Sequence, residues 1–431
     1  MSSYPAVEPQ AAAVQPAQRE TRLWHSQAHM PTVKRSERII ARGEGAYIWT
    51  EDGHRLLDLP ASLWYANVGH GRREIASAIA EQLGRIEAYS TFQRYATRPA
   101  LDLAERVAAL APVDDPRICL TSGGSDSVDL ASKLVRRFWS AQDRPEKRTI
   151  VTRDEAYHGL HGFGTSIAGI GANREGYGEL VRETARIDTN NPESLQQLIH
   201  ERGADTIAAV FCEPVIGTGG VIPPAPGYLE TIQRLCRDHD ILFVADEVIT
   251  GFGRTGRMFA CERFGLRPDL MLTAKGISSG YLPLGAVVVA RRIWEPFWED
   301  GSDLLFRHGL TYAGHATACA AAMANLDILE REELVARVAE LEGVLTAVLA
   351  PVADHELVRE VRSGVGLLAA VQLHDAGVAA SVAERMVELG VLGRQLNDGS
   401  LHISPPFVVT EEELAGMAET IGEALDWAQA A

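Results

Sequence analysis

The stretch ILFVADE (241–247) decides the fold class, because five apolar residues run without a break into two acids. A short continuous apolar run of this kind is typical of a strand that is buried on both faces of a parallel sheet. TIAAVFCEP (206–214) repeats the pattern. Further strand candidates are RICLT (117–121), RTIVT (148–152) and GAVVVA (285–290), with the helical stretch VDLASKLVRRFW (128–139) among them. This alternation predicts an α/β domain with a largely parallel sheet.

The two ends of the chain have a different pattern. GAYIWTEDGHRLLDLPASLWYA (45–66) predicts a β-meander with a turn at Glu51, Asp52 and Gly53. Near the other end, helical spacing of apolar residues predicts an amphipathic helix, and Thr410 before EEEL is a candidate N-cap. The apolar positions of that helix are Leu334, Val338, Leu341, Leu345 and Leu349. We expect a disordered tail at 1–21, a large domain at 71–325, and a smaller domain built from 22–70 and 326–431.

Composition excludes several classes of function. The 431 residues carry 41 Lys and Arg against 58 Asp and Glu, a formal charge of −17, so nothing attracts the chain to nucleic acid. No apolar stretch reaches the roughly 18 residues of a membrane span. The five cysteines are scattered without CxxC spacing, which predicts free thiols in a reducing compartment and no metal site. The N-terminus lacks the pattern of a secretory signal, and we therefore expect a cytoplasmic protein.

Two charged residues stand at the expected ends of strands. Asp246 closes the run ILFVAD, and Lys275 follows PDLMLTA further along the chain. Open α/β sheets bind ligands at the carboxyl edge of their strands, where both side chains should emerge. Alone, Asp246 could equally be a helix cap or half of a buried ion pair, and Lys275 a surface charge. Together they suggest a carbonyl cofactor, since lysine forms Schiff bases and a carboxylate can keep a pyridine nitrogen protonated.

A candidate anion site and a candidate aromatic lid accompany this pair. TSGGSDSVDLASKL (121–134) runs from a strand through small residues into a helix, the layout that offers backbone N–H groups to a phosphate. It matches neither the Walker A nor the dinucleotide pattern, and an ordinary helix cap is the alternative. Tyr157, in YHGLHG (157–162), could stack on a flat ring or be an ordinary loop tyrosine.

With these residues in hand, the chain resembles the class III, pyridoxal-phosphate-dependent aminotransferases of fold type I from about residue 22 onward. The strongest block is FVADEVITGFGRTG (243–256), followed at the usual distance by TAKG (273–276). The resemblance implies a mostly parallel seven-stranded sheet flanked by helices, with a smaller α+β domain from both chain ends. It also implies pyridoxal 5'-phosphate as the cofactor, with Lys275 as the Schiff-base lysine and proton shuttle and Asp246 as the partner of the pyridine nitrogen.

The resemblance carries further site residues. The implied cofactor-binding positions are Gly124 and Ser125 at the phosphate, Val248 and Tyr157 on the two ring faces, Glu213 beside the cofactor, and Leu310 and Thr311 of HGLTYAGH (308–315) reaching the phosphate of the neighbouring subunit. A homodimer with two shared active sites follows from this last implication.

The subfamily resemblance concerns the substrate. LDLPASLWYANVGHG (57–71) and the TY-x-GH block are similar to the ω-transaminases that act on amines and amino-acid–pyruvate pairs. That similarity implies Leu63 and Trp64 in the substrate pocket and Phe92 across the dimer. Arg394, in VLGRQLNDGSLHISPPF (391–407), resembles a mobile arginine that pairs with a substrate carboxylate, although a surface arginine is the alternative.

The chain departs from the family pattern at the phosphate turn. The usual Ser-Gly-Ser-Glu-Ala-Asn-Asp reads GGSDSVD here, so that Asp126 replaces glutamate and Val128 replaces asparagine. Ala316 stands in place of the usual proline after the histidine of TYAGH. An anion site built on backbone amides survives these changes, but they suggest a specialised branch, such as one in a biosynthetic pathway.

The expected function is therefore transfer of an amino group from an amine or amino acid to a ketone or aldehyde by a ping-pong mechanism. Decarboxylating transamination or aminomutase chemistry on the same fold is the alternative. A cofactor-binding protein without turnover is a third hypothesis, which the Lys275–Asp246 pair argues against because a binding module does not need a proton shuttle.

Overall fold

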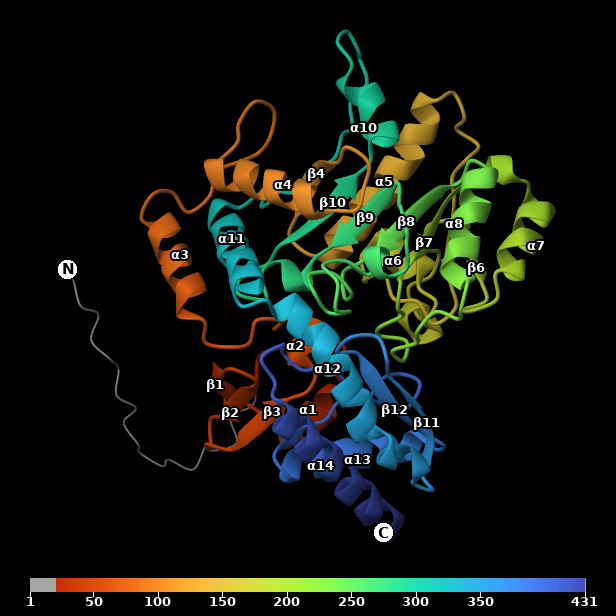
Figure 1. Cartoon of the computed structure of the whole chain (residues 1–431). Helices are drawn as coiled ribbons and strands as arrows, with labels where there is room; N and C mark the ends of the chain where they lie inside the picture. Colours follow the sequence, from red (N-terminus) through yellow and green to blue (C-terminus); the bar gives the residue numbers. More distant parts are fainter. Residues whose placement is uncertain (1–20, 431) are drawn as a thin grey trace.

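The computed structural model describes residues 21–430 (Figure 1). Except for Thr21, the predicted tail lies outside the described residues. The strands are β1 (Ile40–Glu44), β2 (Tyr47–Thr50), β3 (Arg55–Asp58), β4 (Arg117–Thr121), β5 (Thr149–Arg153), β6 (Thr184–Ile187), β7 (Ile207–Cys212), β8 (Leu242–Asp246), β9 (Leu270–Thr273), β10 (Gly285–Val289), β11 (Val358–Arg362), β12 (Ala369–Leu373), β13 (Val391–Leu392) and β14 (Ser400–Ile403).

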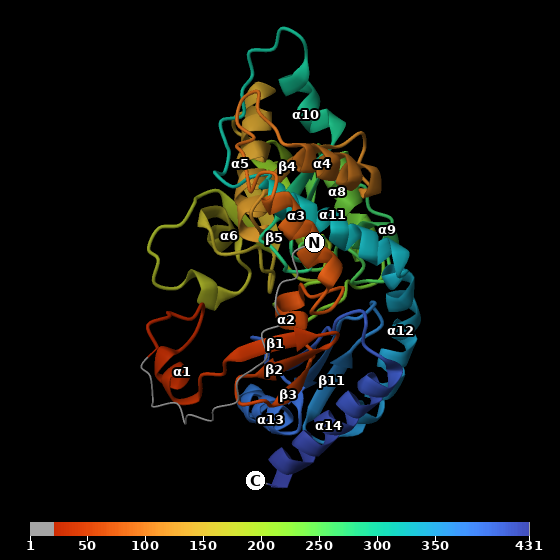
Figure 2. The same ribbon diagram turned by 90° about the vertical axis from the view of Figure 1, so that its left-hand side faces the viewer.

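The helices divide between the two parts of the molecule. Around the large sheet lie α3 (Arg73–Leu83), α4 (Arg98–Leu110), α5 (Gly124–Ala141), α6 (Gly162–Ile167), α7 (Glu193–Arg202), α8 (Tyr228–Asp238), α9 (Ala260–Arg263), α10 (Arg291–Trp298) and α11 (Ala316–Arg331). The remaining helices are α1 (Met30–Ser36), α2 (Ala61–Trp64), α12 (Leu334–Leu349), α13 (Ala376–Glu388) and α14 (Glu411–Ala430). Figure 2 shows α12 leading from the large sheet down to the smaller part.

The large sheet has seven strands in the order β4-β10-β9-β8-β7-β5-β6. Strands β6, β5, β7, β8 and β9 pair in parallel, whereas β10 is antiparallel to both β9 and β4. The exception has a simple cause, because only the short segment 274–284 separates β9 from β10. A parallel return requires a longer crossover, usually with a helix. The prediction of a largely parallel sheet is confirmed.

Strand β8 shows why its sequence is apolar throughout. Leu242 and Val244 belong to the apolar cluster that contains α5, while Phe243 and Ala245 belong to the cluster that contains α8. Side chains of a strand alternate between the two faces of a sheet, so helices on both faces require apolar residues at every position. The strand ends where Asp246 emerges at the carboxyl edge, level with Leu272 of β9.

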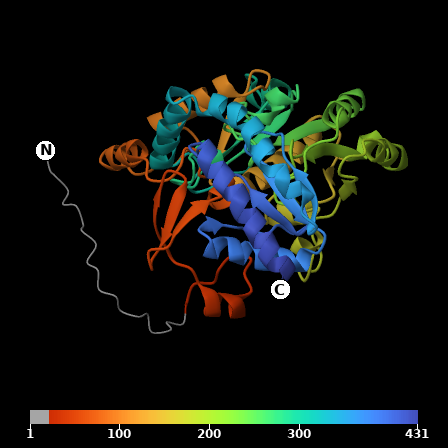
Figure 3. The ribbon, with the colours of Figure 1, turned by 60° about the horizontal axis from the view of Figure 1, so that its bottom comes forward.

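The smaller part joins both ends of the chain. Strands β1, β2 and β3 form the predicted antiparallel meander, and β13 from the C-terminal part pairs in parallel with β3 through Val391 and Leu57. A second sheet has the order β11-β12-β14. Figure 3 shows the red N-terminal strands beside the blue C-terminal helices. The fold class is thus confirmed, a seven-stranded α/β part and a smaller α+β part, whereas the residue limits of the two domains stay predictions.

Two local predictions about the C-terminal part are confirmed. The five apolar positions predicted from helical spacing are buried along one side of α12. Thr410 begins α14 with a reciprocal cap: its hydroxyl accepts a hydrogen bond from the Glu413 N–H at 3.1 Å, and the Glu413 carboxylate accepts one from the Thr410 N–H at 2.8 Å. This arrangement satisfies two backbone donors that the first turn of a helix otherwise leaves free.

Candidate active site

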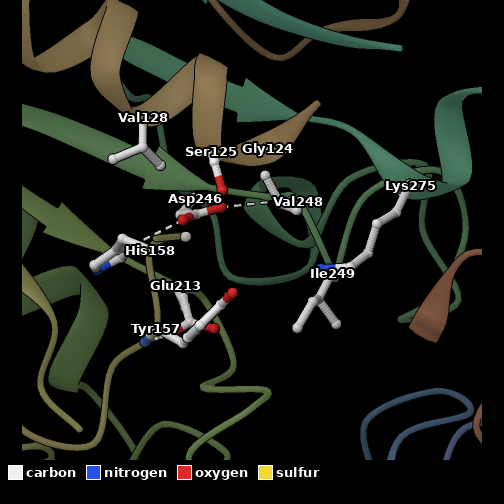
Figure 4. A pocket seen from close by; sticks show the side chains of 11 residues that line it. Gly124, Ser125, Val128, Tyr157, His158, Glu213, Asp246, Val248, Ile249 and Lys275 are labelled. Atoms are coloured by element: carbon white, nitrogen blue, oxygen red, sulfur yellow. Dashed lines mark hydrogen bonds and ion pairs between the residues drawn. The ribbon is translucent and has the colours of Figure 1, made fainter. Parts of the chain in front are cut away.

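A cavity of about 140 Å³ lies at the carboxyl edge of the large sheet (Figure 4). It is where the strand-end acids, the lysine and the start of α5 converge. The lining residues are Gly124, Ser125, Val128, Tyr157, His158, Gly159, Glu213, Asp246, Val248, Ile249 and Lys275. Seven of the positions predicted from the sequence are in this set: Gly124, Ser125, Tyr157, Glu213, Asp246, Val248 and Lys275. The sheet therefore brings together segments that lie far apart in the chain.

Asp246 is buried and firmly oriented. Its Oδ2 atom lies 2.7 Å from His158 Nδ1, and its Oδ1 atom accepts a hydrogen bond from the Val248 N–H at 3.1 Å. The other ring nitrogen of His158 lies 2.9 Å from Thr152 Oγ1, which fixes the plane of the imidazole. The chain Thr152–His158–Asp246 holds a carboxylate that would be costly to bury without partners. Sequence reasoning assigned no role to His158, and the sole signal for it was its position directly after Tyr157.

Glu213 holds the loop that carries Tyr157. One carboxylate oxygen accepts a hydrogen bond from the Tyr157 N–H at 2.9 Å, and the other accepts one from the Gly217 N–H at 3.0 Å. Burial raises the pKa of Glu213, and the nearby Asp246 carboxylate raises it further. In Figure 4 the side chains of Tyr157 and Glu213 lie next to each other on one side of the cavity. Glu213 therefore positions the aromatic wall of the cavity.

Lys275 stands opposite, in the short 3-10 turn Lys275–Ile277 that follows β9. Figure 4 shows its side chain extending into the cavity. Burial lowers the pKa of the amine to about 8, although Asp246 and Glu213 act in the opposite direction. An amine with such a pKa is substantially neutral near pH 8, and only the neutral amine is a nucleophile and a proton acceptor. The site thus contains an activated lysine whose pKa is influenced by two nearby acids.

The start of α5 forms a cradle of small residues. A Cβ atom on Gly124 would lie 2.9 Å from Val248 Cγ1, so a larger residue would push the helix away from the cavity. Gly159 has a φ of +77°, and a Cβ atom there would lie 2.4 Å from Ser125 Oγ. These two glycines let the helix N-terminus, with its free backbone N–H groups, border the cavity directly. This edge of the cavity suits an anion.

Trp64, Arg394 and His402 form a stack beside the lysine. The Arg394 guanidinium lies 4.7 Å from the centre of the Trp64 ring, which lies 4.2 Å from that of His402. Lys275 Nζ is 5.5 Å from the same Trp64 ring. Burial, with help from three neighbouring cations, lowers the pKa of His402 well below its ordinary value, so the imidazole is neutral. Sequence reasoning predicted Trp64 and Arg394 at the site but missed His402.

The stack contains hydrogen-bonding capacity that the chain does not use. Within the part of the chain that the structure describes, Trp64 Nε1, Arg394 Nη1 and His402 Nδ1 are buried without a hydrogen-bond partner. Buried polar atoms without partners are uncommon and need an explanation such as a bound molecule. These unpaired polar atoms are consistent with a polar ligand on this side of the site.

Four predicted residues lie outside both the cavity lining and the stack beside the lysine. The side chains of Leu63 and Phe92 are 48% and 49% exposed, and Thr311 is exposed beside Leu310. Phe92 contacts the 308–315 segment of its own chain, since a Cβ atom on Gly309 would lie 2.6 Å from the Phe92 ring. Thr91 strengthens this contact by donating a hydrogen bond to the Ala313 carbonyl at 3.2 Å. The two segments predicted to act across a dimer thus form one exposed unit.

The described residues hold neither a metal cluster nor a membrane-spanning helix. No cluster of three or more His, Cys, Asp or Glu residues with metal-binding geometry occurs between residues 21 and 430. Over the same residues, no helix combines the length and the hydropathy that a membrane crossing demands.

A parallel sheet whose carboxyl edge carries a low-pKa lysine, a buried carboxylate and a helix N-terminus defines a class of enzyme that handles amines and carbonyl groups. The chain belongs to the class III aminotransferases, because the model of the family described as "Aminotransferase class-III" matches residues 30–425. It is 35% identical to the putrescine–pyruvate aminotransferase of Pseudomonas aeruginosa, with 96% of this chain and 98% of that protein covered.

Solved structures of transaminases agree with this assignment. A transaminase from the marine bacterium Virgibacillus has a TM-score of 0.91 and 38% identity, covering 95% of this chain and 97% of that chain. An amine transaminase from an uncultivated Pseudomonas species, solved in its PLP-bound form, has a TM-score of 0.90 and 36% identity, covering 95% and 100%. The protein is thus an aminotransferase with the fold of the ω-transaminases, and the expectation of amino-group transfer is confirmed.

Proposed function

We propose that this aminotransferase uses pyridoxal 5'-phosphate to move an amino group from an amine or amino-acid donor to a ketone or aldehyde acceptor in a ping-pong cycle. One observation carries the proposal: the low-pKa amine of Lys275 and the His158-oriented carboxylate of Asp246 line the same cavity. A lysine that can form a Schiff base and an acid that can pair with a pyridine nitrogen are the two groups that this cofactor needs.

The residues present fit the cofactor. The cradle of Gly124 and Gly159 leaves the N-terminus of α5 open to a phosphate, and Ser125 lies in the same turn. Val248 and Tyr157 offer an apolar and an aromatic side chain for the two faces of a flat ring. Val128, which stands where relatives usually have asparagine, adds apolar surface to the cavity and does not remove a backbone donor.

Each residue has a physical role in this scheme. When bound, pyridoxal phosphate supplies an aldehyde that condenses with amines and a ring that takes up electrons. Lys275 Nζ would remove the proton from the substrate carbon that bears nitrogen and later give it back. Asp246 would keep a proton on the pyridine nitrogen, with His158 and the Val248 N–H holding the carboxylate in place. Glu213 would keep Tyr157 against the cofactor ring, because its carboxylate accepts a hydrogen bond from the Tyr157 N–H.

The substrate side has two components. Trp64, together with Leu63 and Phe92, would present apolar surface to the organic part of a donor. Arg394 would pair with a carboxylate through its planar guanidinium, which has an unused buried donor at Nη1. The relative from Pseudomonas aeruginosa is named for a diamine and a keto acid, which supports one pocket that accepts both kinds of substrate.

A homodimer completes the site in this proposal. Phe92, Leu310 and Thr311 lie outside the cavity of their own chain but share one exposed unit. Next to these residues in the chain are the large exposed side chains Tyr89, Tyr95, Leu305 and Tyr312, which a second subunit would cover. This unit would reach the phosphate and the substrate of the neighbouring subunit. A cytoplasmic location also stays a prediction of the sequence.

A visible absorption spectrum of the purified protein with added pyridoxal phosphate tests the proposal. Binding should give a yellow band, which a suitable amine should bleach and pyruvate should restore. Alanine, glutamate, putrescine and a simple amine, each tested separately, would then rank the donors. A protein that stays colourless with added cofactor would overturn the proposed role of the cavity.

A further inference from the structure

The segment that carries Leu63 and Trp64 has an unusual backbone. Three of the four residues of α2 have positive φ values, with Ala61 at 44°, Ser62 at 60° and Trp64 at 63°. Ser62 combines its φ with a ψ of −91°, a region that side chains with a Cβ rarely occupy. Figure 1 shows α2 at the junction of the two parts of the molecule. Residues in such conformations persist only where surrounding contacts enforce them, and they concentrate at functional sites.

A buried carboxylate enforces the conformation from one side. Both oxygens of Asp58 accept a hydrogen bond from the Ser62 N–H, at 3.0 and 2.9 Å. His70 Nε2 lies 2.8 Å from Asp58 Oδ2 and keeps the carboxylate turned toward the segment. Asp58 is only 1% exposed, so water cannot replace these contacts. The strained turn therefore has a fixed anchor at its start.

The side chain of Ser62 fastens the turn from the other side. Its hydroxyl donates a hydrogen bond to the Tyr65 hydroxyl at 2.5 Å. The Tyr65 ring covers Gly280 so closely that a Cβ atom on Gly280 would lie 2.2 Å from Tyr65 Cδ2. The 3-10 turn of Lys275 continues through residues 278–280, which end at Gly280. In this continuation, Ser279 accepts a hydrogen bond from the Val68 N–H at 3.3 Å. The wall segment and the lysine turn are thus joined.

We propose that Ser62 is a positioning residue for substrate selection, whose hydroxyl bond to Tyr65 holds the Leu63–Trp64 wall at a fixed distance from Lys275. The inference rests on the proposed substrate role of that wall. A glycine would adopt the conformation of residue 62 without strain, so folding alone does not favour serine there. The hydroxyl is the group that glycine lacks, and its partner Tyr65 lies directly on the lysine turn.

Four variants separate the hydroxyl bond from the backbone strain. Ser62→Ala and Tyr65→Phe remove the bond and keep the strained backbone, whereas Ser62→Gly removes both. Asp143→Gly is the matched control, because Asp143 is an exposed residue with a φ of 55° in the loop after α5, far along the chain from the wall. Steady-state kcat and KM are measured for 1-phenylethylamine and for putrescine with pyruvate as the acceptor, and the melting temperature of each holoenzyme is recorded.

We expect the ratio of kcat/KM for 1-phenylethylamine over putrescine to rise at least fivefold in Ser62→Ala, Tyr65→Phe and Ser62→Gly, mainly through KM for the bulky amine. When the Leu63–Trp64 segment is no longer held in place, the Trp64 ring can move aside for a larger substrate group. Asp143→Gly should melt about 1–3 °C higher because it loses a strained position, whereas Ser62→Gly should gain less because it also loses the hydrogen bond to Tyr65. Asp143→Gly should leave the ratio unchanged.

Three results would count against the inference. A ratio within twofold of wild type in both Ser62→Ala and Tyr65→Phe would overturn it, whatever the melting temperatures. A ratio that changes equally in Asp143→Gly would also overturn it, since the effect would then follow general stability. A wild-type enzyme that accepts neither amine would instead overturn the proposed substrate role of the wall, and with it this inference.

Discussion

The two walls of the active site are built in opposite ways. The inner wall is formed by Asp246, Glu213 and Lys275. Its two acids directly end or follow strands of the large sheet, are 4% and 3% exposed, and have hydrogen bonds at both carboxylate oxygens. The outer wall consists of loops and turns, with Leu63 and Phe92 about half exposed and a strained backbone beneath Trp64.

The difference shows which task each wall can perform. Groups that move protons must keep their positions within a fraction of an ångström, and strand ends in a packed sheet provide that precision. Groups that choose the substrate can lie on loops, where a change in sequence alters a pocket without disturbing the sheet. Changes to the inner wall should therefore affect every substrate alike, whereas changes to the outer wall should affect some substrates more than others.

The largest effect is expected for Lys275→Ala. Without Nζ the site has neither a nucleophile nor a proton shuttle, and turnover should fall by about 10⁴-fold or more for all donors. The protein should still bind the cofactor through the contacts of the cradle and the ring faces. Stopped-flow measurement of each half-reaction checks the rate, and Lys275→Arg is the control that retains a charge without a reactive amine. Near-normal rates in Lys275→Ala would rule out the assigned role.

Asp246→Asn comes next, with half-reactions slowed by roughly 10²–10³-fold, the range seen when one preorganised electrostatic group is removed. The neutral amide cannot hold a proton on the pyridine nitrogen. His158→Leu is the companion variant, because it leaves the Asp246 carboxylate but removes its 2.7 Å contact with Nδ1, and it should cause a smaller loss. Single-turnover rates that match wild type in Asp246→Asn would contradict the role of this acid.

The outer wall should respond selectively. Arg394→Ala is expected to lower kcat/KM for donors with a carboxylate, such as alanine, by about 10–100-fold, since a charge-assisted hydrogen bond contributes roughly 1.5–3 kcal/mol. Simple amines should lose little. Arg394→Lys keeps the positive charge but lacks the planar guanidinium that can bind a carboxylate through two N–H groups. It should therefore recover only part of the lost kcat/KM. If alanine and a simple amine lost activity equally, Arg394 would have no special role toward carboxylates.

The inner wall is also the part that the sequence predicts best. Asp246 ends one apolar strand and Lys275 follows another that is apolar except for Thr273, so strand ends place them without knowledge of any distant contact. His158 and His402 escaped prediction because their roles depend on partners far away in the chain, Asp246 for the first and Trp64 for the second. The strained turn at Ser62 was also missed, for a different reason: Asp58 and His70 lie only four and eight residues away, but no residue preference predicts a serine in this conformation.

The smallest effect is the pH dependence of cofactor capture, which tests the inner wall without any substitution. Burial lowers the pKa of Lys275 from 10.5 to about 8, so the amine becomes neutral as the pH rises through about 8. The rate at which cofactor-free protein captures pyridoxal phosphate should therefore fall about tenfold for each pH unit below that value and level off above it. The rise of visible absorbance after mixing, followed from pH 6 to pH 10, measures this rate.

A second buried lysine provides the control for this profile. Burial also lowers the pKa of Lys147 to about 8, but its Nζ donates to the Ala204 carbonyl at 3.1 Å and lies over Trp139, away from the cavity lining. Lys147→Gln should thus keep the same midpoint, whereas Lys275→Ala should give no covalent capture at any pH. A midpoint near 10 in the wild type would mean that the cavity does not desolvate the Lys275 amine, and the inner wall would then owe its chemistry to the bound cofactor alone.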